Sequence, residues 1–416
     1  MGLPVTIKSC RLCRSTALVE VLDLGTLDFT GVFPLPDEEI DSGRLRLLVC
    51  DSCGLAQLGD SFDPDVMYGD NYGYRSGLNA SMVAHLARTT SRLQQKIGLR
   101  SGDVVLDIGS NDGTLLRTYP YEVEGIRRIG IDPTVAKFSK FYRIAGWPME
   151  GHAAFFTADT YDAITRKRAK IVTSIAMFYD LEDPVHFAQD VHHVLAPDGL
   201  WHFEVAYAPT MLRSGAYDTI CHEHVEYYTL TTIKRILDEA GFIIVDVVTN
   251  AINGGSIAVT AAKVGSTWPR ECNVTAWMLA KEKREKVGDP LTWIAFAERV
   301  RERQRDLQGL LSSLHVNGST ICALGASTKG NVLLQSSGIG TALIDAVGDV
   351  NPYKYGRVTP GTHIPIVSEA DALAMAPDYL LILPWHFRET FMTSLAPYLA
   401  GGGRLIFPLP DIEIVG

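Results

Sequence analysis

The stretch that decides the fold is VVLDIGSNDGTLL, residues 104–116. A short apolar segment, 104–108, runs into a turn that contains Gly109 and Gly113 and then into the start of a helix. Because glycine has no side chain, a bound molecule can approach the backbone at both positions. The free N–H groups of the first helical turn can face a carboxylate. The stretch therefore predicts the ligand-binding βα turn of an open α/β sheet.

Two acidic residues stand at strand ends beside this turn. Asp107 can order the turn or face an ammonium group, and Asp132, at the end of the next predicted strand, can accept both hydroxyls of a ribose. A dinucleotide fold would show G-x-G-x-x-G, whereas this turn reads G-x-x-x-G. The pattern resembles class I S-adenosylmethionine-dependent methyltransferases; the alternative is a generic βα turn with a structural glycine. The cofactor contacts implied by the resemblance are Asp107, Gly109, Asn111, Asp112, Gly113 and Asp132.

Strands and helices alternate on both sides of the turn. Further strands are predicted at 128–131, 171–175, 200–205, 242–248 and 256–262, and helices at 76–97, 184–195 and 231–240. This alternation predicts a parallel sheet with helices on both faces. A charged helical stretch at 275–314, expected to be mostly solvated, leads to a second α/β unit with strands at 319–325, 343–349, 379–383 and 403–407.

The composition is that of a folded chain with a small-molecule ligand. Hydrophobic residues make up 46% of the 416 residues and charged residues 21%, so a packed core is expected. The formal net charge of −10 argues against nonspecific nucleic-acid binding, which needs a basic surface. We see no apolar run of about 18 residues, which a membrane span would need. Residues 1–14 lack a signal-peptide core, so we expect a cytoplasmic protein.

Four of the seven cysteines form two C-x-x-C pairs near the N-terminus, Cys10 with Cys13 and Cys50 with Cys53. Four thiolates in a tetrahedral array suit Zn²⁺ and leave no open position for chemistry. The two pairs therefore predict a structural zinc site. Reduced, unliganded cysteines or a redox pair are the alternative.

The segment 221–228, CHEHVEYY, concentrates ionisable side chains between apolar neighbours. Histidine titrates near neutrality and can take a proton in a catalytic step. A metal site is one alternative, but the adjacent side chains of His222, Glu223 and His224 diverge, and the spacing is not H-E-x-x-H. A purely structural histidine cluster is the other.

A second candidate ligand turn, GASTKGN, occupies residues 325–331. Ser327, Thr328, Lys329 and the free N–H groups of the following helix could hold a pyrophosphate. The full Walker spacing is absent, so ATP hydrolysis is not supported. An ordinary packing turn is the alternative. Trp385 and His386 follow a predicted strand and could also line the cleft, although core packing suits Trp385 better.

The order of these motifs along nearly the whole chain resembles the sugar-nucleotide C-methyltransferases of deoxysugar biosynthesis. Those enzymes add a methyl group to C3 of a 4-keto hexose. The motifs are the C-x-x-C pairs, D-I-G-x-N-D-G at 107–113, H-E-H-x-E-Y-Y at 222–228, N-G-G-S at 253–256 and G-A-S-T-K-G-N at 325–331. The resemblance implies that a base removes the C3 proton, which the C4 carbonyl acidifies. The resulting enolate then attacks the methyl group of S-adenosylmethionine.

The resemblance also implies roles for single residues. His224 is the expected base, with Glu223 as the neighbour that orients or polarises it. Tyr74 and Ser76 lie in a segment that closes over the cofactor, although packing in an interdomain seam is an alternative for Tyr74. The implied substrate contacts are His222, Ser327, Thr328, Lys329, Asn331 and Arg357.

The chain departs from the family at two positions. Cys221 stands where a tyrosine is expected, three residues before the base, and a histidine expected after the fourth strand is replaced by the segment 178–180. We interpret Tyr179 as a substitute hydrogen-bond donor and keep Cys221 among the catalytic candidates. These departures leave the substituent on C3 open, and they leave room for an oxygen acceptor.

We therefore expect an α/β protein with a class I methyltransferase, Rossmann-like sheet, a small N-terminal zinc-binding unit and a C-terminal α/β domain. The expected boundaries are 1–70 for the zinc-binding domain, 71–265 for the methyltransferase domain, 266–316 for a helical connector and 317–416 for the nucleotide-sugar-binding domain. The expected ligands are S-adenosylmethionine, structural Zn²⁺ and a nucleotide-linked keto sugar, with no nucleic acid and no membrane. An O- or N-methyltransferase and a non-catalytic cofactor-binding protein are the alternative functions.

Overall fold

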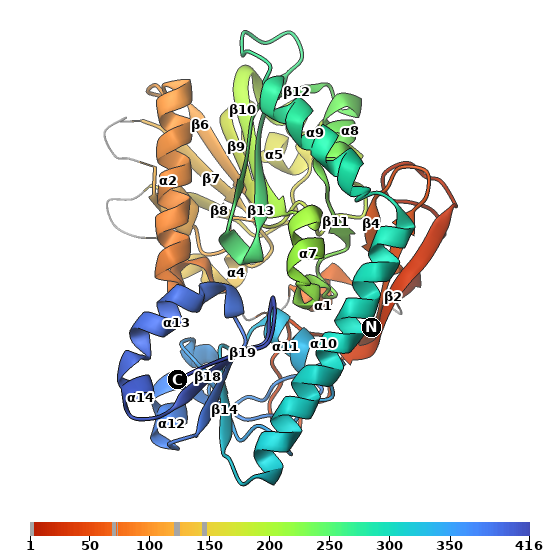
Figure 1. Ribbon diagram of the computed structural model, residues 1–416. Helices are drawn as coiled ribbons and strands as arrows, with labels where there is room; N and C mark the ends of the chain where they lie inside the picture. Colours follow the sequence, from red (N-terminus) through yellow and green to blue (C-terminus); the bar gives the residue numbers. More distant parts are fainter. Residues whose placement is uncertain (1–3, 69–71, 73, 120–124, 144–147) are drawn as a thin grey trace.

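A computed structural model describes residues 4–68, 72, 74–119, 125–143 and 148–416. Figure 1 shows two α/β units, one above the other, with an N-terminal group of strands on one flank. A long helix, α10 (Pro290–Val316), runs from the upper unit down the side of the lower one. The expected α/β class, with a methyltransferase-like sheet between two smaller units, is confirmed.

The upper unit is built on a seven-stranded sheet with the order β12-β13-β10-β9-β6-β7-β8. Strands β6 to β10 run parallel, and β12 and β13 close the sheet as an antiparallel hairpin. All five residues of β6 are buried, as expected for a strand covered on both faces. The strands are β6 (Val104–Ile108), β7 (Arg127–Ile131), β8 (Glu150–His152), β9 (Ala169–Ile175), β10 (Leu195–Ala206), β12 (Phe242–Asn250) and β13 (Ser256–Lys263).

Helices of the upper unit cover both faces of this sheet (Figure 1). The helices are α2 (Ala80–Ile97), α3 (Thr114–Arg117), α4 (Val135–Phe138), α5 (Ala158–Ile164), α6 (Pro184–Val194), α7 (Ala208–Ser214) and α8 (Leu230–Glu239). Short 3₁₀ turns lie at Ser76–Leu78, Ser139–Phe141, Tyr217–Thr219 and Ile252–Gly254. α2 begins at Asn79, whose side chain accepts from the Ser81 N–H, and it ends at Gly98 in the left-handed conformation.

The N-terminal strands form a four-stranded sheet with the order β11-β4-β3-β2. Its members are β2 (Leu18–Asp28), β3 (Ser42–Cys50), β4 (Ala56–Leu58) and β11 (Glu226–Tyr227); β1 (Val5–Thr6) pairs with β5 (Asp60–Ser61), and α1 (Pro64–Met67) follows. The expected domain boundary between residues 70 and 71 lies outside the described residues. β11 comes from the CHEHVEYY segment, so the zinc-binding unit and the candidate catalytic segment share one sheet.

The lower unit has a six-stranded sheet with the order β16-β15-β14-β17-β18-β19. The strand predicted at 343–349 is shorter in the structure, where only β15 forms, because residues 341–343 make a turn. Strands β16 and β19 were not predicted. The strands are β14 (Ile321–Leu324), β15 (Val347–Asp349), β16 (Ile366–Ser368), β17 (Tyr379–Ile382), β18 (Arg404–Phe407) and β19 (Glu413–Val415). The helices are α11 (Thr328–Ser336), α12 (Glu369–Ala374), α13 (Arg388–Ser394) and α14 (Ala396–Ala400), with 3₁₀ turns at Pro352–Lys354 and Trp385–Phe387.

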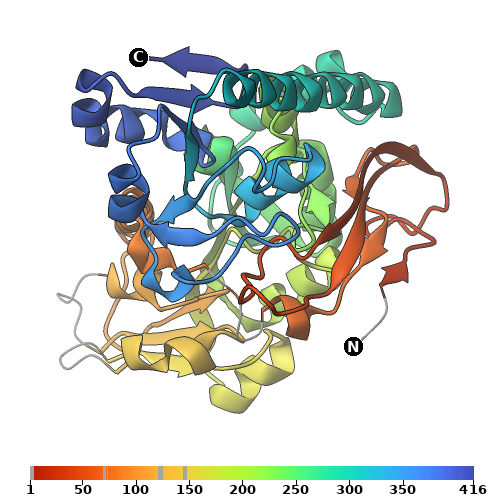
Figure 2. The same cartoon turned by 90° about the horizontal axis from the view of Figure 1, so that it is seen from below.

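The connector is helical and mostly solvated, as predicted, but one face of it is buried. It consists of α9 (Asn273–Glu285) and α10, and the side chains of Trp293, Phe296 and Val300 on α10 are completely buried. This face packs in one hydrophobic core with the N-terminal strands. Figure 2 shows α10 extending across the molecule beside the C-terminal unit and the N-terminal strands. The charged sequence conceals an apolar stripe that joins all three units.

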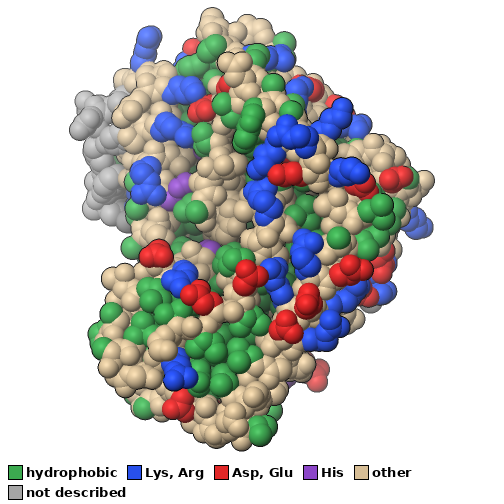
Figure 3. Space-filling model, in the orientation of Figure 1, with side chains coloured by type: hydrophobic (Ala, Val, Ile, Leu, Met, Phe, Trp, Pro, Cys, Tyr) green, Lys and Arg blue, Asp and Glu red, His purple; other side chains and the backbone are tan. Residues whose placement is uncertain are grey.

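The visible surface carries mixed charge. On the face seen in Figure 3, Lys and Arg side chains alternate with Asp and Glu along the flank formed by α10. In the part of the chain that the structure describes, no helix has both the length and the apolar character needed to cross a bilayer.

Candidate active site

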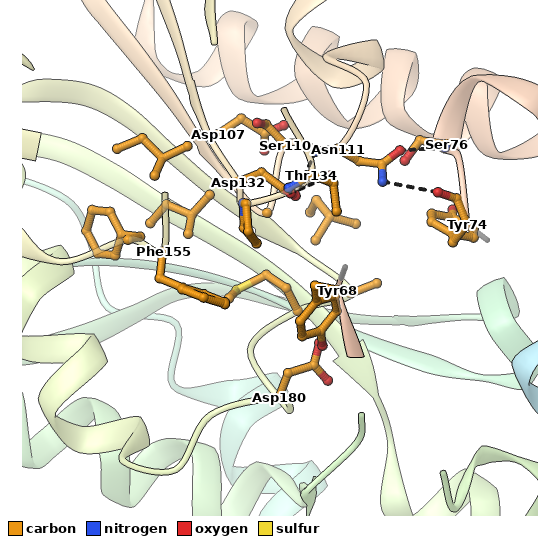
Figure 4. Close-up of a pocket in the computed structure, with 18 of the residues that line it drawn as sticks. Tyr68, Tyr74, Ser76, Asp107, Ser110, Asn111, Asp132, Thr134, Phe155 and Asp180 are labelled. Atoms are coloured by element: carbon orange, nitrogen blue, oxygen red, sulfur yellow. Dashed lines mark hydrogen bonds between the residues drawn. The ribbon is translucent and has the colours of Figure 1, made fainter. Parts of the chain in front are cut away.

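A cavity of about 300 Å³ lies where β6, β7 and β9 end. Parallel strands deliver the residues that follow them to one edge of the sheet, so this is the expected place for a ligand. In Figure 4, Asp107, Ser110, Asp132 and Thr134 lie along one wall, and Tyr68 and Asp180 lie across from them. Six of the predicted cofactor residues line the cavity: Tyr74, Ser76, Asp107, Gly109, Asn111 and Asp132.

The two strand-end carboxylates are buried and held in place by hydrogen bonds. Asp107 accepts a 2.6 Å hydrogen bond from the Thr173 hydroxyl, and burial raises the pKa of Asp107 to about 7. Asp132 accepts from the Asn111 N–H at 2.9 Å and from the Thr134 N–H at 2.6 Å. Burial also raises the pKa of Asp132, against the hydrogen bonds that it accepts. Two acceptors therefore face the cavity from adjacent strands.

The turn between β6 and α3 holds a second chain segment over the cavity. The Asn111 side chain accepts from the Ser76 N–H at 3.0 Å and donates to the Tyr74 carbonyl at 3.3 Å. The Asp112 carboxylate, completely buried, accepts from Arg75 Nε at 3.0 Å and from the Gly77 N–H at 3.2 Å. The segment 74–77 is thereby fixed above the cavity.

Two predicted cofactor residues have a different position. Asp112 does not line the cavity, because its carboxylate is turned toward the segment 74–77. Gly113, with φ of 73°, starts α3, and a side chain there would press on the Tyr142 ring at 3.2 Å. Both residues shape the turn instead of meeting the ligand. Tyr72, in the same tyrosine-rich stretch as Tyr74, also lines the cavity. Tyr68, Phe155, Met177 and Asp180 line it too but were missed, since no local motif marks them.

The cavity suits S-adenosylmethionine by its chemistry. Asp107 and Asp132 offer acceptors for an ammonium group and for ribose hydroxyls. The wall formed by Leu115, Phe155 and Met177 offers apolar surface for a flat base. Gly109, with φ of 72°, lets the backbone approach the ligand, where a side chain would meet Met177 at 2.9 Å. The residues present therefore fit this cofactor.

The four N-terminal cysteines come together as predicted. Their sulfur atoms all lie within 4.8 Å of one another, with 3.6 Å between Cys10 and Cys53 and 3.5 Å between Cys13 and Cys50. A ZnS₄ tetrahedron with Zn–S distances of about 2.3 Å needs sulfurs about 3.8 Å apart. The donor set and its spacing therefore fit a structural zinc ion.

The two cysteine pairs adopt the same backbone turn. The Arg14 N–H donates to the Cys10 carbonyl at 2.9 Å, and the Gly54 N–H donates to the Cys50 carbonyl at 2.8 Å. Arg14 and Gly54 both have positive φ, 61° and 75°. This repetition around the four sulfurs is what a tetrahedral metal centre needs from two C-x-x-C turns.

Arg11, between the first two cysteines, ties the zinc site to the strands beneath the candidate base. Only 2% of Arg11 is exposed, and its guanidinium donates to the Leu58 carbonyl at 2.7 Å and to Glu182 at 2.9 Å. Leu58 ends β4, which pairs with β11, two residues beyond His224. The zinc site therefore supports the catalytic segment through one arginine and one strand pair.

His224 has one ring nitrogen bound and the other open. Nδ1 lies 3.0 Å from the Thr219 carbonyl, which can only accept, so the proton is assigned to Nδ1. Nε2 has no hydrogen-bond partner among the described residues. The Tyr179 ring lies against the imidazole, with 4.1 Å between the ring centres. Burial, and secondly the charge of Lys329, lower the pKa of His224 to about 3.

Glu223 and Cys221, close to His224 in the sequence, are both buried. The Glu223 carboxylate is 5% exposed, and burial raises its pKa, which the Cys221 and Thr30 side chains partly oppose. Burial raises the pKa of the Cys221 thiol, which is completely buried. A β-carbon added at Gly31 would lie 1.8 Å from Glu223 Oε1, so a loop of the zinc-binding unit fits directly against this carboxylate.

Two predicted substrate residues instead hold that loop. His222 is completely buried, packs between Phe29 and Phe62 with ring centres 4.9 and 4.8 Å away, and directs Nε2 to the Gly43 carbonyl at 3.1 Å. Asn331, also completely buried, donates to the Thr30 carbonyl at 2.7 Å. Neither side chain is open to a substrate, so we withdraw both from the substrate contacts.

The GASTKGN turn joins β14 to α11, as predicted. Ser327 caps α11 by accepting from the Gly330 N–H at 3.0 Å. Lys329, half-buried, donates to the Asn253 carbonyl at 2.7 Å and so bridges the C-terminal unit and the N-G-G-S turn of the upper unit. Arg357 donates to the Phe33 carbonyl at 2.6 Å and borders a different groove, with Pro36 and Tyr355.

Three parts of the chain match known protein families. Residues 10–68 match a family described as a zinc binding domain, residues 79–247 a methyltransferase domain, and residues 251–410 the C-methyltransferase C-terminal domain. The C-methyltransferase NovU of Streptomyces niveus is 32% identical over 422 residues, which cover 98% of this chain and 97% of that protein.

Two solved methyltransferase structures resemble part of the chain. The plantazolicin methyltransferase BpumL in complex with SAH is 12% identical, covers 43% of this chain and 82% of its own, and superposes with a TM-score of 0.34. The mitomycin 7-O-methyltransferase MmcR is 12% identical, covers 44% of this chain and 55% of its own, with a TM-score of 0.35. At such TM-scores these likenesses have no bearing on the function.

Proposed function

This chain belongs to the C-methyltransferase family of S-adenosylmethionine-dependent enzymes, and on that premise we propose that it methylates carbon C3 of a nucleotide-linked 4-keto deoxysugar. Two features support this substrate class. One is the neutral imidazole of His224, which has an open nitrogen. The other is the N-terminus of α11 together with Lys329, which bridges the C-terminal unit and the upper unit.

The observation that carries the proposal is the state of His224. Its Nδ1 faces the Thr219 carbonyl at 3.0 Å, so the lone pair is on Nε2, which has no partner among the described residues. The pKa of about 3 keeps this imidazole unprotonated at neutral pH. A neutral imidazole with its lone pair free can accept a proton.

The base is suited to a carbon beside a ketone. His224 Nε2 takes the C3 proton, and the electron pair of the C–H bond passes into the enolate, whose negative charge lies on the C4 oxygen. S-adenosylmethionine, when bound, supplies a methyl group on a positively charged sulfur for the nucleophilic carbon. His224 then releases its proton to water. The Tyr179 ring, packed against the imidazole, and the Thr219 carbonyl keep it in this orientation.

The diphosphate of the substrate is assigned to the start of α11. The free N–H groups of the first turn of this helix favour an anion. Lys329 supplies a positive charge beside them, and Thr328 a hydroxyl. We keep Ser327, Thr328 and Lys329 as phosphate contacts. Arg357 borders another groove, so it is kept only for a more distant part of the nucleotide.

The test is the position of the transferred methyl group. The enzyme is incubated with S-adenosylmethionine carrying ¹³C in its methyl group and with a panel of nucleoside diphosphate-linked 4-keto deoxyhexoses. NMR of the product distinguishes a methyl group on carbon from one on oxygen or nitrogen. Methyl on C3 is the expected product. Methyl on a hydroxyl, an amino group or another ring carbon would refute the proposal.

A further inference from the structure

A second histidine, His386, lies at the seam between the C-terminal unit and the upper unit, and nothing described above uses it. It belongs to the 3₁₀ turn Trp385–Phe387, directly before α13. In Figure 1, α13 lies beneath the end of the β12–β13 hairpin, where the two units meet. The turn at the end of that hairpin packs on Trp385, because a β-carbon at Gly254 would lie 3.4 Å from the indole.

His224 and His386 are anchored through two consecutive residues. The Thr219 carbonyl lies 3.0 Å from His224 Nδ1, and the neighbouring Asp218 carboxylate accepts a 2.8 Å hydrogen bond from Trp385 Nε1. Consecutive Cα atoms are about 3.8 Å apart. One 3₁₀ turn, Tyr217–Thr219, therefore holds the base and the residue next to His386.

Lys329 is the second link between the two histidines. Its charge lowers the pKa of both imidazoles in addition to burial, and both pKa values fall to about 3. Lys329 itself is fixed by the Asn253 carbonyl at 2.7 Å. His224, Lys329 and His386 are each partly exposed.

The two imidazoles carry their protons on opposite nitrogens. His386 Nδ1 is buried with no hydrogen-bond partner among the described residues, so a proton there would be a buried donor without an acceptor. Buried N–H groups without acceptors are rarer in proteins than buried acceptors without donors. The proton therefore belongs on Nε2, which is not among the buried atoms lacking partners. On this assignment the open ring nitrogen of His224 carries a lone pair, and that of His386 carries an N–H group.

We propose that His386 is a catalytic hydrogen-bond donor to the substrate's ketone oxygen, acting while His224 removes the adjacent proton. This inference rests on the proposed function. As the C–H bond breaks, its electron pair forms the C=C bond of the enolate and the carbonyl π pair moves onto oxygen. The His386 N–H hydrogen bond strengthens with that charge. When the carbon takes the methyl group, the C=O bond re-forms and His386 keeps its proton. A neutral imidazole can stabilise an enolate in this way.

The first test measures the tautomers without any substrate. In protein labelled with ¹⁵N-histidine, NMR identifies which ring nitrogen carries the proton, and His224→Gln and His386→Gln assign the signals. The expected result is an Nδ1–H tautomer for His224 and an Nε2–H tautomer for His386 at pH 7. A proton on Nδ1 of His386, or a charged His386, would overturn the inference.

The second test uses His386 variants whose side-chain amide N–H group takes the position of either Nδ1 or Nε2. The glutamine amide can reach the position of Nε2, whereas the asparagine amide reaches only that of Nδ1. Exchange of the C3 proton with deuterium, in the presence of S-adenosylhomocysteine, should fall about 10²–10³-fold in His386→Ala and His386→Asn, the usual loss of an oxyanion donor. It should stay within about tenfold of wild type in His386→Gln. The surface variant His315→Gln is the matched control, with exchange expected as in wild type.

The outcomes separate this inference from the proposed function. Affinity for nucleoside diphosphates and for S-adenosylhomocysteine should be unchanged in all His386 variants. An active wild type with an equally active His386→Ala variant would overturn the inference alone. Equal losses in His386→Asn and His386→Gln, together with a lower melting temperature, would show a structural role and also overturn it. A wild type that neither exchanges nor methylates any 4-keto sugar nucleotide would overturn both.

Discussion

Replacing Gly31 by alanine tests whether the carboxylate of Glu223, the residue before the base, must hold its position. The new β-carbon would lie 1.8 Å from Glu223 Oε1, 3.1 Å from Glu223 Cδ and 3.4 Å from the Thr328 hydroxyl. The φ of Gly31 lies outside the left-handed region, so lack of space is the only obstacle. Its loop is also anchored, because Asn331 donates to the Thr30 carbonyl at 2.7 Å.

The size of the effect follows from this overlap. Carbon and oxygen atoms in contact lie about 3.5 Å apart, so the carboxylate or the loop must move by roughly 1.5 Å. A displacement of about 1 Å near the chemistry costs about 10² in rate, and overpacking a buried site costs about 1–3 kcal/mol of stability. We therefore expect Gly31→Ala to lower kcat for methyl transfer about 100-fold and the free energy of unfolding by about 1–3 kcal/mol.

The assay pairs turnover with denaturant unfolding in four proteins besides wild type: Gly31→Ala, Glu223→Ala, the double variant of both, and a control. Gly309→Ala on α10 is the control, because nothing lies within 4 Å of the added carbon; a helical glycine-to-alanine change should stabilise by about 0.5–1 kcal/mol and leave kcat unchanged. The double variant Gly31→Ala/Glu223→Ala removes the clash and should be no less stable than Glu223→Ala. If Gly31→Ala keeps kcat within threefold and unfolds like wild type, Glu223 is not held as described.

Other changes probe the remaining parts of the site. Cys13→Ser should abolish zinc binding. Because Arg11 and the β4–β11 pair connect the zinc site to the catalytic segment, kcat should also fall about 10–100-fold. Full activity in zinc-free protein would contradict this connection. Asp132→Asn should raise the Kd for S-adenosylhomocysteine, measured by calorimetry, about 10–100-fold, because hydrogen bonds to a charged acceptor contribute about 1.5–3 kcal/mol. An unchanged Kd would show that Asp132 does not bind the cofactor. Because its pKa is about 3, His224 stays unprotonated as the pH falls, so kcat/KM should show no acid limb near the ordinary histidine pKa of about 6.5. Lys329→Met should raise that pKa and move the acid limb to higher pH; an unmoved limb would refute the influence of Lys329.

The parts of the site that could be predicted from the sequence are those written in short motifs. Gly109, Asp107 and Asp132 follow from one βα turn and the next strand end, since parallel strands deliver their ends to the same edge of the sheet. The zinc site follows from two C-x-x-C pairs, because the metal geometry dictates the pairing of four thiolates. In each case the residue spacing and the ligand chemistry define the site.

The misplaced residues depend on contacts between distant parts of the chain. Asp112 turned out to hold the segment 74–77, because its partner Arg75 lies 37 residues earlier. His222 and Asn331 hold the Thr30 loop across separations of 192 and 301 residues. The buried face of α10 was likewise concealed, because apolar residues such as Trp293 are spread among charged ones. No local sequence pattern indicates which of several adjacent polar residues will be buried in the core.

The most direct test of the central claim is exchange of the C3 proton of a 4-keto sugar nucleotide with deuterium oxide. S-adenosylhomocysteine occupies the cofactor site, so no methyl group is transferred and only proton removal is measured. Wild-type enzyme should catalyse exchange at C3. In His224→Gln the exchange rate should be lower by a factor of about 10²–10⁴, the usual contribution of a general base. Exchange that persists in His224→Gln within tenfold of wild type would show that another group removes the proton.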